Sequence, residues 1–598
     1  MGRSSTNWIW WILCVIHTLP LFIKTIHGLT PQSPIQCNQT ICTLQNSYGT
    51  WNDRKICYAL NVTYPTNEEE LRLAVSYVVQ NNLKAKVVTK FSHTIPKLSC
   101  PLQQQNIINN NNNVNSAFLI STEKYNSGIE IDAKNLFVTV DSGVGLRPLI
   151  DEVEKNGFSL GGVPYWEGVS VGGVISTGAH GSSWWGKGGA FHDHVLGINL
   201  VVPASKSEGY AKVLRLEPND PLLKAAKVSL GVLGAISKVK LSIEPRFKRS
   251  ITYNFTDDTD IENIYIDHAK KYEFADITWY PSRNTAVYRY DFRVPLNTSG
   301  DGHFDFIGFQ ANPIFISESV RGAEKLLENM RSTKGKCLTA ATTLGFKKLT
   351  ANGLKNNGLI FTGYPVIGYQ GKMQTSGSCL YSTKSDTSCA WDPRIKGLFF
   401  YESTAIFPAS KFKDFIIDVK KLRDIDPQKF CGIDIYNGIL IRYIKASDAY
   451  LGQIEDSIVI DFNYYRANDP FTPRLNQDVW EELEQLAFFK YGAKPHWAKN
   501  RNLAFLGVQK KYPKFNLFIE AKNKLDPQSV FSGDWSDEIL YGKDSIKYDG
   551  CALEGQCICS EDRHCSPQKG YYCKNGLVYN EARVCRYSST SASLDSLQ

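Results

Sequence analysis

The segment from residue 161 to residue 189 constrains this chain most, because glycine and other small residues crowd it. Its densest part, residues 169–183, reads Val-Ser-Val-Gly-Gly-Val-Ile-Ser-Thr-Gly-Ala-His-Gly-Ser-Ser. Glycine lets a backbone approach a ligand closely, and successive N–H groups can then face an anion such as a pyrophosphate. The segment is neither a Gly-x-Gly-x-x-Gly motif nor a P-loop, since no Lys-Ser/Thr follows. The residues alone leave two interpretations open, a phosphate cradle and a turn that is glycine-rich for packing.

Alternating and helical patterns surround this segment. Before it, the periodicity predicts a helix over 67–81, a strand over 85–89, strands over 117–122 and 136–141, and a helix over 146–156. After it, residues 195–202 and 235–243 alternate as strands do, and this first unit ends near Pro245. From Arg249 onward, strands mix with helices such as 320–330, 411–422 and 478–489, which is typical of an α+β domain.

Three motifs in a fixed order resemble one family. Residues 171–183, read as Val-Gly-Gly-x-x-x-Thr-Gly-x-His-Gly-x-Ser, are similar to the central FAD motif of the vanillyl-alcohol-oxidase-type flavoproteins. Residues 140–149 and 233–237 resemble the segments that precede and follow this motif in that family. The resemblance implies a two-part FAD-binding domain of the PCMH type over 57–245 and an α+β cap domain over 249–545.

A later motif, His496-Trp497-Ala498-Lys499, is similar to the signature of the aldonolactone oxidoreductases. Together with the cysteine-rich tail, it makes the chain resemble the plant L-gulono-1,4-lactone oxidase group over nearly its whole mature length. This resemblance implies FAD-dependent oxidation of L-gulono-1,4-lactone, or a related aldonolactone, by dioxygen. The products would be the 2-keto lactone or L-ascorbate and hydrogen peroxide.

The resemblance also assigns roles to individual residues. Arg442, His496 and Lys499 would be catalytic, with His496 and Lys499 supplying positive charge near the flavin pyrimidine. Two positions depart from the family pattern: the run Lys90-Phe-Ser-His-Thr94 lacks glycines, and Leu440 replaces the Glu of a Glu-x-Arg pair. The residues expected to contact FAD are His93 (with a possible covalent bond), Gly172, Gly173, Thr177, Gly178, His180 and Ile236.

The N-terminus predicts export. Arg3 precedes the apolar run 8–23, which is shorter than the roughly 20 residues that a spanning helix needs. We therefore expect a signal peptide over 1–28, no stable membrane insertion, and secretion to the extracellular space or cell wall. A net charge of +8 without a dense Lys/Arg block argues against a nucleic-acid partner. Glycosylation sequons, expected on surface loops, begin at Asn38, Asn61, Asn254 and Asn297.

Cysteine usage agrees with an oxidising compartment. Of 15 cysteines, Cys14 lies in the predicted signal, which leaves 14, an even number. Six of them lie in a tail over 551–586 that is too short for a core of its own. We expect these six to pair internally, in a module outside the catalytic site that FAD binding and turnover do not need. Zinc binding by Cys557, Cys559, His564 and Cys565 is the alternative.

Two other functions stay open at this level. The same FAD scaffold would serve a secreted oxidase of another sugar or alditol. The missing glycines before His93 and the leucine at position 440 would also suit a non-catalytic, wall-associated binding protein whose flavin site has decayed.

Overall fold

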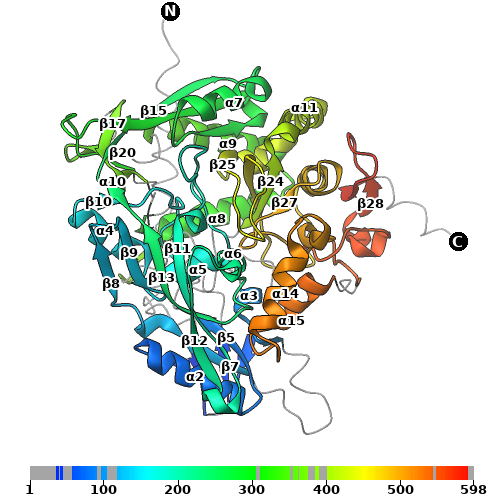
Figure 1. The fold of residues 1–598 in the computed structure, drawn as a ribbon. Helices are drawn as coiled ribbons and strands as arrows, with labels where there is room; N and C mark the ends of the chain where they lie inside the picture. Colours follow the sequence, from blue (N-terminus) through cyan, green and yellow to red (C-terminus); the bar gives the residue numbers. More distant parts are fainter. Residues whose placement is uncertain are drawn as a thin grey trace, which may run out of the picture.

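Two sheets, one of three strands and one of five, carry the core of the N-terminal unit in the computed structural model (Figure 1). The structure describes residues 35–39, 41–44, 57–89, 96–103, 117–304, 310–350, 354–360, 363–374, 377, 384–389, 400–542 and 547–589. One sheet is parallel, in the order β4 (Asn61–Thr63), β7 (Ala117–Ser121), β5 (Lys84–Val88). The second is antiparallel, in the order β12 (Ala211–Leu216), β11 (Val195–Pro203), β13 (Ala235–Ser242), β9 (Phe137–Asp141), β8 (Ile129–Asp132).

Local signals explain the helices of this unit. Helix α2 (Glu68–Gln80) begins where the Asn67 side chain accepts the N–H of Glu70, and its buried residues recur at helical spacing. Helix α4 (Leu146–Lys155) buries one apolar stripe in the same way. The predicted helices over 67–81 and 146–156 are thus confirmed to within a residue or two at each end.

A larger, eight-stranded antiparallel sheet follows the N-terminal unit. One face is apolar and is covered by α7 (Ile261–Lys271), α11 (Ala409–Ile425) and α13 (Gln477–Gln485). The other face carries charged side chains and turns toward the glycine-rich segment. The strand order is β22 (Val366–Tyr369), β15 (Lys248–Asp257), β17 (Thr285–Val294), β16 (Asp276–Tyr280), β25 (Ile439–Ile444), β26 (Ser457–Tyr465), β24 (Phe400–Pro408), β27 (Lys494–Pro495).

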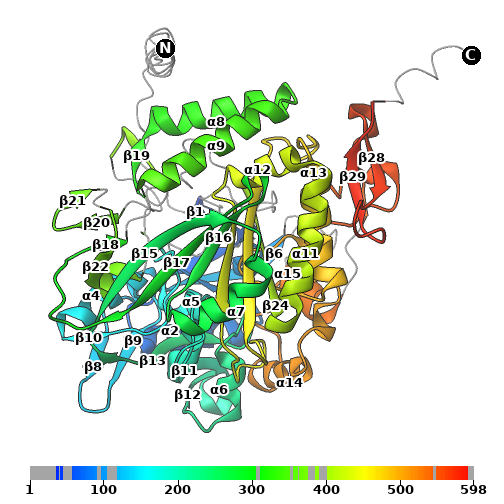
Figure 2. The same cartoon turned by 90° about the horizontal axis from the view of Figure 1, so that it is seen from above.

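A pair of helices lies beyond this sheet (Figure 2). Helix α8 (Ile314–Asn329) packs beside α9 (Thr333–Thr350), and a disulfide joins Cys337 of α9 to Cys431, the first residue of α12 (Cys431–Asp434). Of the helices in the described part of the chain, none combines the length and apolar character needed to cross a membrane. The predicted signal peptide lies outside the described residues.

The end of the predicted cap domain returns to the FAD-binding unit. Helix α14 (Phe515–Leu525) and helix α15 (Asp534–Tyr541) contribute Phe518 and Trp535 to the same core as Val140 and Val171. Within the predicted cap domain over 249–545, α14 and α15 thus pack on the FAD-binding unit, and the bounds of that domain stay a prediction. The apolar faces of α14 and α15 are buried against the first unit, not against the eight-stranded sheet.

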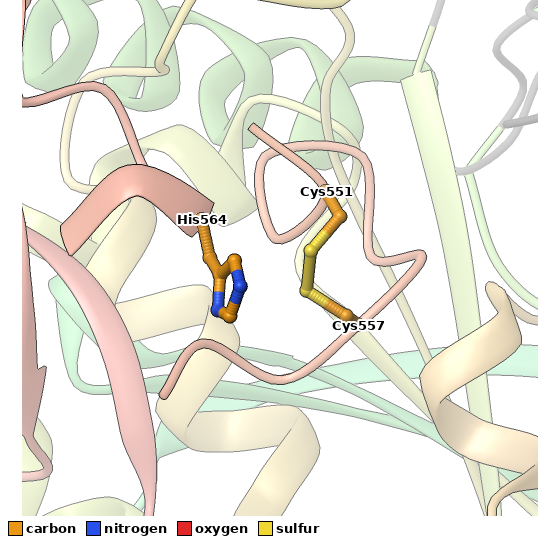
Figure 3. A group of neighbouring side chains, drawn as sticks. All are labelled: Cys551, Cys557 and His564. Atoms are coloured by element: carbon orange, nitrogen blue, oxygen red, sulfur yellow. A yellow bond between two sulfur atoms is a disulfide. The ribbon is translucent and has the colours of Figure 1, made fainter. Parts of the chain in front are cut away.

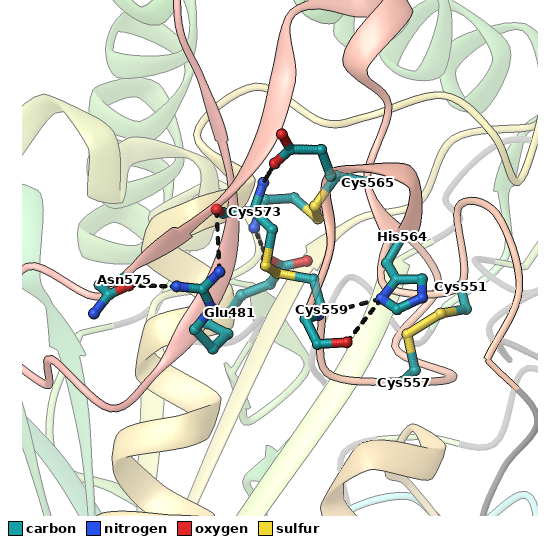
Figure 4. Close-up of a disulfide and its surroundings, with 12 residues drawn as sticks. Glu481, Cys551, Cys557, Cys559, His564, Cys565, Cys573 and Asn575 are labelled. Atoms are coloured by element: carbon teal, nitrogen blue, oxygen red, sulfur yellow. Dashed lines mark hydrogen bonds between the residues drawn. A yellow bond between two sulfur atoms is a disulfide. The ribbon is translucent and has the colours of Figure 1, made fainter.

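The cysteine-rich tail pairs internally, as predicted. Its disulfides are Cys551–Cys557, Cys559–Cys573 and Cys565–Cys585, and its strands β28 (Tyr571–Asn575) and β29 (Arg583–Tyr587) form a hairpin (Figure 4). His564 lies beside the Cys551–Cys557 bond (Figure 3). Zinc coordination by Cys557, Cys559, His564 and Cys565 is wrong for this state, because the three sulfurs are consumed in disulfides and offer no thiolate. Outside the tail, the described residues include the disulfides Cys37–Cys42 and Cys57–Cys100.

The tail packs on the rest of the protein, and its expected dispensability for FAD binding and turnover stays a prediction. Strand β29 lies against α13 (Figure 2). Buried Glu482 accepts the backbone N–H groups of Leu577, Val578 and Tyr579 at 2.6–2.9 Å. Because a buried carboxylate that loses its donors is costly, the tail and α13 form one folding unit.

Candidate active site

The charged face of the large sheet presents a cluster at its centre. In the sheet register Leu440 of β25 lies directly opposite Asp461 of β26, and Thr404 of β24 lies on the other side of Asp461. Arg442 stands two residues along β25, on the same face, because side chains alternate along a strand. Three adjacent strands thus bring Thr404, Arg442 and Asp461 together.

Asp461 holds two cations at once. Arg442 Nη2 donates to Asp461 Oδ2, and Lys499 Nζ lies 2.9 Å from Asp461 Oδ1. Lys499 Nζ also lies 2.7 Å from Glu402 Oε1, and the Thr404 hydroxyl donates to Asp461 Oδ1. Arg442 and Asp461 are buried, whereas Lys499 and Glu402 are partly exposed.

The charges of this cluster are stabilised mutually. Burial alone would raise the pKa of Asp461, but Arg442 and Lys499 lower it well below its usual range. Burial alone would lower the pKa of Lys499, but Asp461 and Glu402 raise it. The cluster therefore keeps a carboxylate between a guanidinium and an ammonium at physiological pH.

His496 is neutral, which corrects the prediction that it supplies positive charge. Burial, together with nearby Lys499, lowers the pKa of His496 to about 3. Its Nδ1 accepts the backbone N–H of Ala498 at 3.0 Å, so its Nε2 carries the proton. The signature motif thus supplies one cation, Lys499, and one neutral hydrogen-bond donor.

The glycine-rich segment lies across this cluster. The backbone N–H of Ser183 donates to Tyr443 O at 2.8 Å, and Arg442 Nη1 donates to His180 O at 3.1 Å. The close contact depends on Gly188, where a Cβ atom would lie 2.6 Å from Cβ of Lys445, the residue after β25. The motif predicted for the cofactor and the cation cluster are therefore one site.

The short helix α5 (Val171–Ser176) carries Gly172 and Gly173. Its first N–H groups are already bonded: Gly172 N–H donates to Ser142 O at 2.9 Å, and Gly173 N–H to Ser170 Oγ at 3.3 Å. A Cβ on Gly172 would crowd Ser142, whereas Gly173 is exposed and a Cβ there would meet only Ser170 Oγ. Because their N–H groups are already bonded, these glycines offer a ligand few free donors. Their contribution is a backbone surface without side chains, which a ligand can approach closely.

A pocket adjoins this segment, and several of the predicted residues line it. Among the described residues, neither ring nitrogen of buried His192 has a hydrogen-bond partner, nor does Nε2 of buried His180. His180 Nδ1 donates to Gly181 O at 2.9 Å, and its ring centroid lies 5.3 Å from that of His496. Unpaired polar atoms in such a place fit a polar ligand such as a flavin cofactor. The pocket's lining includes Thr177, Gly178, His192, His496, Trp497 and Tyr512.

Of the remaining predicted cofactor residues, Ile236 lies in the five-stranded sheet of the FAD-binding unit, away from this cluster. Ile236 is buried on β13 beside Leu200 of β11, and its expected contact with adenine stays a prediction. His93 falls outside the described residues, so its place relative to the site stays a prediction too.

Sequence reasoning missed the residues that surround Arg442. Tyr165 donates to Asp276 at 2.6 Å, its ring centroid lies 5.5 Å from the Arg442 guanidinium, and Arg289 Nη1 lies 3.1 Å from the same Asp276 carboxylate. It also missed Asp461, although the sequence held a signal. Asp461 interrupts the apolar run 458–462, and a charge placed in a buried strand requires a partner.

Family models match three parts of the chain. The model described as "FAD binding domain" matches residues 59–206, and that of "D-arabinono-1,4-lactone oxidase" matches residues 398–539. A third, "L-gulonolactone oxidase 2-like, C-terminal domain", matches residues 548–587. The first contains the glycine-rich segment, the second contains Arg442, Asp461 and Lys499, and the third contains the disulfide tail.

Relatives and solved structures agree with these matches. L-gulonolactone oxidase 3 of Arabidopsis thaliana is 65% identical over 96% of this chain and 98% of its own length, and L-gulonolactone oxidase 5 of that plant is 46% identical over 97% and 98%. L-gulonolactone oxidase of Bos taurus is 25% identical over 80% of this chain and 94% of its own. A cholesterol oxidase described as solvent-stable shares the fold, with a TM-score of 0.62, 14% identity, and coverage of 84% of this chain and 100% of that one. The chain belongs to the L-gulonolactone oxidase family of FAD-dependent flavoproteins.

Proposed function

We propose that this protein oxidises L-gulono-1,4-lactone, or a close aldonolactone, with dioxygen as the electron acceptor. The observation that carries the proposal is the Arg442–Asp461–Lys499 cluster lying directly beneath the glycine-rich FAD motif. Bound FAD would supply the hydride acceptor for the carbinol carbon next to the lactone carbonyl and the route of the electrons to dioxygen, which would become hydrogen peroxide. The names of the relatives support this substrate class.

The chain's own residues divide the remaining work. Gly172, Gly173, Thr177 and Gly178 would give the cofactor a close backbone surface, and the unpaired nitrogens of His192 would hold its polar atoms. Lys499 would stabilise the negative charge that a reduced flavin carries. Arg442, fixed by Asp461 and the His180 carbonyl, would orient the substrate's oxygens.

The proton of the substrate hydroxyl needs an acceptor. His180 donates through Nδ1 to a carbonyl, so its Nε2 carries a free lone pair. Burial, together with Arg442 and His496, holds the pKa of His180 well below its usual value, so the ring stays neutral. His180 Nε2 would therefore accept a hydrogen bond from the substrate hydroxyl and orient it, while the proton itself would pass to water.

Asp461 would substitute for the carboxylate absent at position 440. Leu440 and Asp461 are cross-strand partners, so their Cβ atoms stand about 5 Å apart on one face of the sheet. A carboxylate at either position therefore faces the same region beside Arg442. The leucine thus does not deprive the site of negative charge.

The purified protein should be yellow, with about one FAD per chain, and anaerobic L-gulono-1,4-lactone should bleach it. Absorbance spectra before and after mixing, and then a peroxide assay in air, provide the measurement. Bleaching by another sugar but not by the lactone would favour the other oxidase, and a colourless folded protein that takes up no FAD would favour the binding protein.

Acid precipitation of the same sample tests a covalent bond to His93, because bonded flavin pellets with the protein.

Lys499→Met should slow anaerobic flavin reduction by about 10²–10³-fold, because one preorganised charge contact is lost. Stopped-flow absorbance measures the rate at saturating lactone. Lys510→Met is the matched control, since Lys510 is exposed on the following turn. Equal reduction rates in Lys499→Met and the wild type would show that Lys499 does not act on the flavin.

Asp461→Asn should slow the same reduction by about 10²-fold, because Arg442 and Lys499 lose the group that positions both. Adding Leu440→Glu should restore part of the rate, since it returns a carboxylate to the opposite residue. Glu455→Gln, an exposed change just before the same strand, is the control. A faster reduction in Asp461→Asn would mean that Asp461 only weakens the field of Lys499.

We also propose that the protein is secreted and glycosylated. The apolar run 8–23 and the disulfides support export. The sequon residues Asn38, Asn61 and Asn297 are exposed, whereas Asn254 is partly buried and its side chain donates to Tyr290 at 2.9 Å. We expect mass spectrometry of protein recovered from plant-cell medium to find a mature N-terminus near Gly28 and glycans on the exposed sites. An intact N-terminal run in that protein would refute cleavage.

A further inference from the structure

The first loop of the tail lies against the segment that follows the His496–Lys499 motif. The Cys551–Cys557 disulfide closes this loop, and Glu554 and Gly555 lie at its turn. The backbone N–H of Leu503 donates to Gly555 O at 3.1 Å. The loop therefore contacts the chain four residues after Lys499.

Two fully buried arginines join the loop to the body of the protein. Arg474 donates to the carbonyl of Leu553 and lies 3.0 Å from Glu554 Oε1. Arg501 pairs with Glu484 of α13, and its guanidinium lies over the Trp480 ring, 3.9 Å from the centroid. A Cβ atom on Gly555 would lie 2.5 Å from Arg501 Nε, so the loop backbone is packed directly on this side chain.

A chain of hydrogen bonds leads from Arg501 back to the cation cluster. Glu484 Oε1 accepts the hydroxyl of Ser403 at 2.8 Å, and Asn500 Nδ2 donates to that hydroxyl at 3.3 Å. Asn500 Oδ1 accepts the backbone N–H of His496 at 2.9 Å. Ser403 stands between Glu402 and Thr404, which contact Lys499 and Asp461. Residues on both sides of Lys499 are thus held by groups that touch the tail or α13.

We propose that the Cys551–Cys557 loop is a positioning element for Lys499, which it holds in place through Arg501. Arg501 and Gly555 are positioning residues, since neither reaches the charge cluster itself. Their effect is to restrict the segment 496–503, so that the ammonium stays against Asp461 and Glu402. This inference rests on the proposed role of Lys499 in flavin reduction.

Gly555→Ala tests the proposal against Gly507→Ala. Both glycines have positive φ, +65° and +68°, so alanine strains both backbones alike, but only at position 555 does it press on Arg501. We expect Gly555→Ala to raise amide hydrogen exchange across 500–505 and to slow anaerobic reduction about tenfold. The lactone concentration for half-saturation should change less than twofold, and Gly507→Ala should behave as the wild type in each measurement.

A disulfide pair gives a second test if Gly555→Ala does not fold. Cys551→Ser with Cys557→Ser opens the loop beside Arg501, whereas Cys559→Ser with Cys573→Ser opens a longer loop, of separation 14 instead of 6. Loop entropy makes the second change the more destabilising one. We expect the first pair to slow reduction per bound FAD more, although the second lowers the unfolding temperature more. The proposal would be overturned if the second pair, which is the less stable, also showed the slower flavin reduction per bound FAD.

The two proposals fail in distinguishable ways. Hydrogen exchange across 500–505 reports on the positioning of the segment in protein with or without FAD, so unchanged exchange in Gly555→Ala overturns the positioning role whatever Lys499 does. Raised exchange with unchanged reduction overturns it as well. If Lys499→Met itself reduces at the wild-type rate, the failure lies in the proposed role of Lys499.

Discussion

The carboxylate of Asp461, shared between Arg442 and Lys499, is the interaction on which the site depends. Bringing three charges out of water is costly, and it succeeds only where the geometry is complete. Here the hydroxyl of Thr404 on the neighbouring strand donates a further hydrogen bond to Asp461. The partly exposed carboxylate of Glu402 is the second partner of Lys499. With both carboxylates counted, the two cations are balanced, so Lys499 would act on a flavin as a local charge and not through a net positive field.

This cluster explains why the large sheet has two different faces. Residues such as Ile441, Ile460 and Ala405 face the helices and are fully buried in an apolar core. Their neighbours Arg442, Asp461 and Thr404 face the other way, toward the glycine-rich segment. Small residues are needed in that segment, because its backbone packs directly against the end of β25, as at Gly188 beside Lys445. The FAD-binding unit and the sheet therefore meet through backbone and charge, together with the rings of Tyr165 and Trp184, which lie against Arg442 and Tyr443.

Several particulars were predictable from the residues and others were not. Helices α2 and α4 and strands β7, β9, β11 and β13 follow from local periodicity, and the internal pairing of the tail follows from its composition. The neutrality of His496, the return of α14 and α15 to the first unit, and the docking of the tail on α13 did not follow. Each depends on burial against residues far away in the chain, which no local pattern encodes.

By itself the sequence determined the class of cofactor site, through a run of small residues whose backbone can approach a ligand, and the family, through motifs in a fixed order. Only the tertiary structure decided where the site's negative charge lies. Position 440 holds leucine, and a carboxylate stands opposite it on the neighbouring strand, 21 residues later, at Asp461. The reason is that an antiparallel register brings opposite residues onto one face whatever their separation in sequence. A carboxylate that is missing from a sequence motif can therefore have a spatial neighbour of the same charge on an adjacent strand.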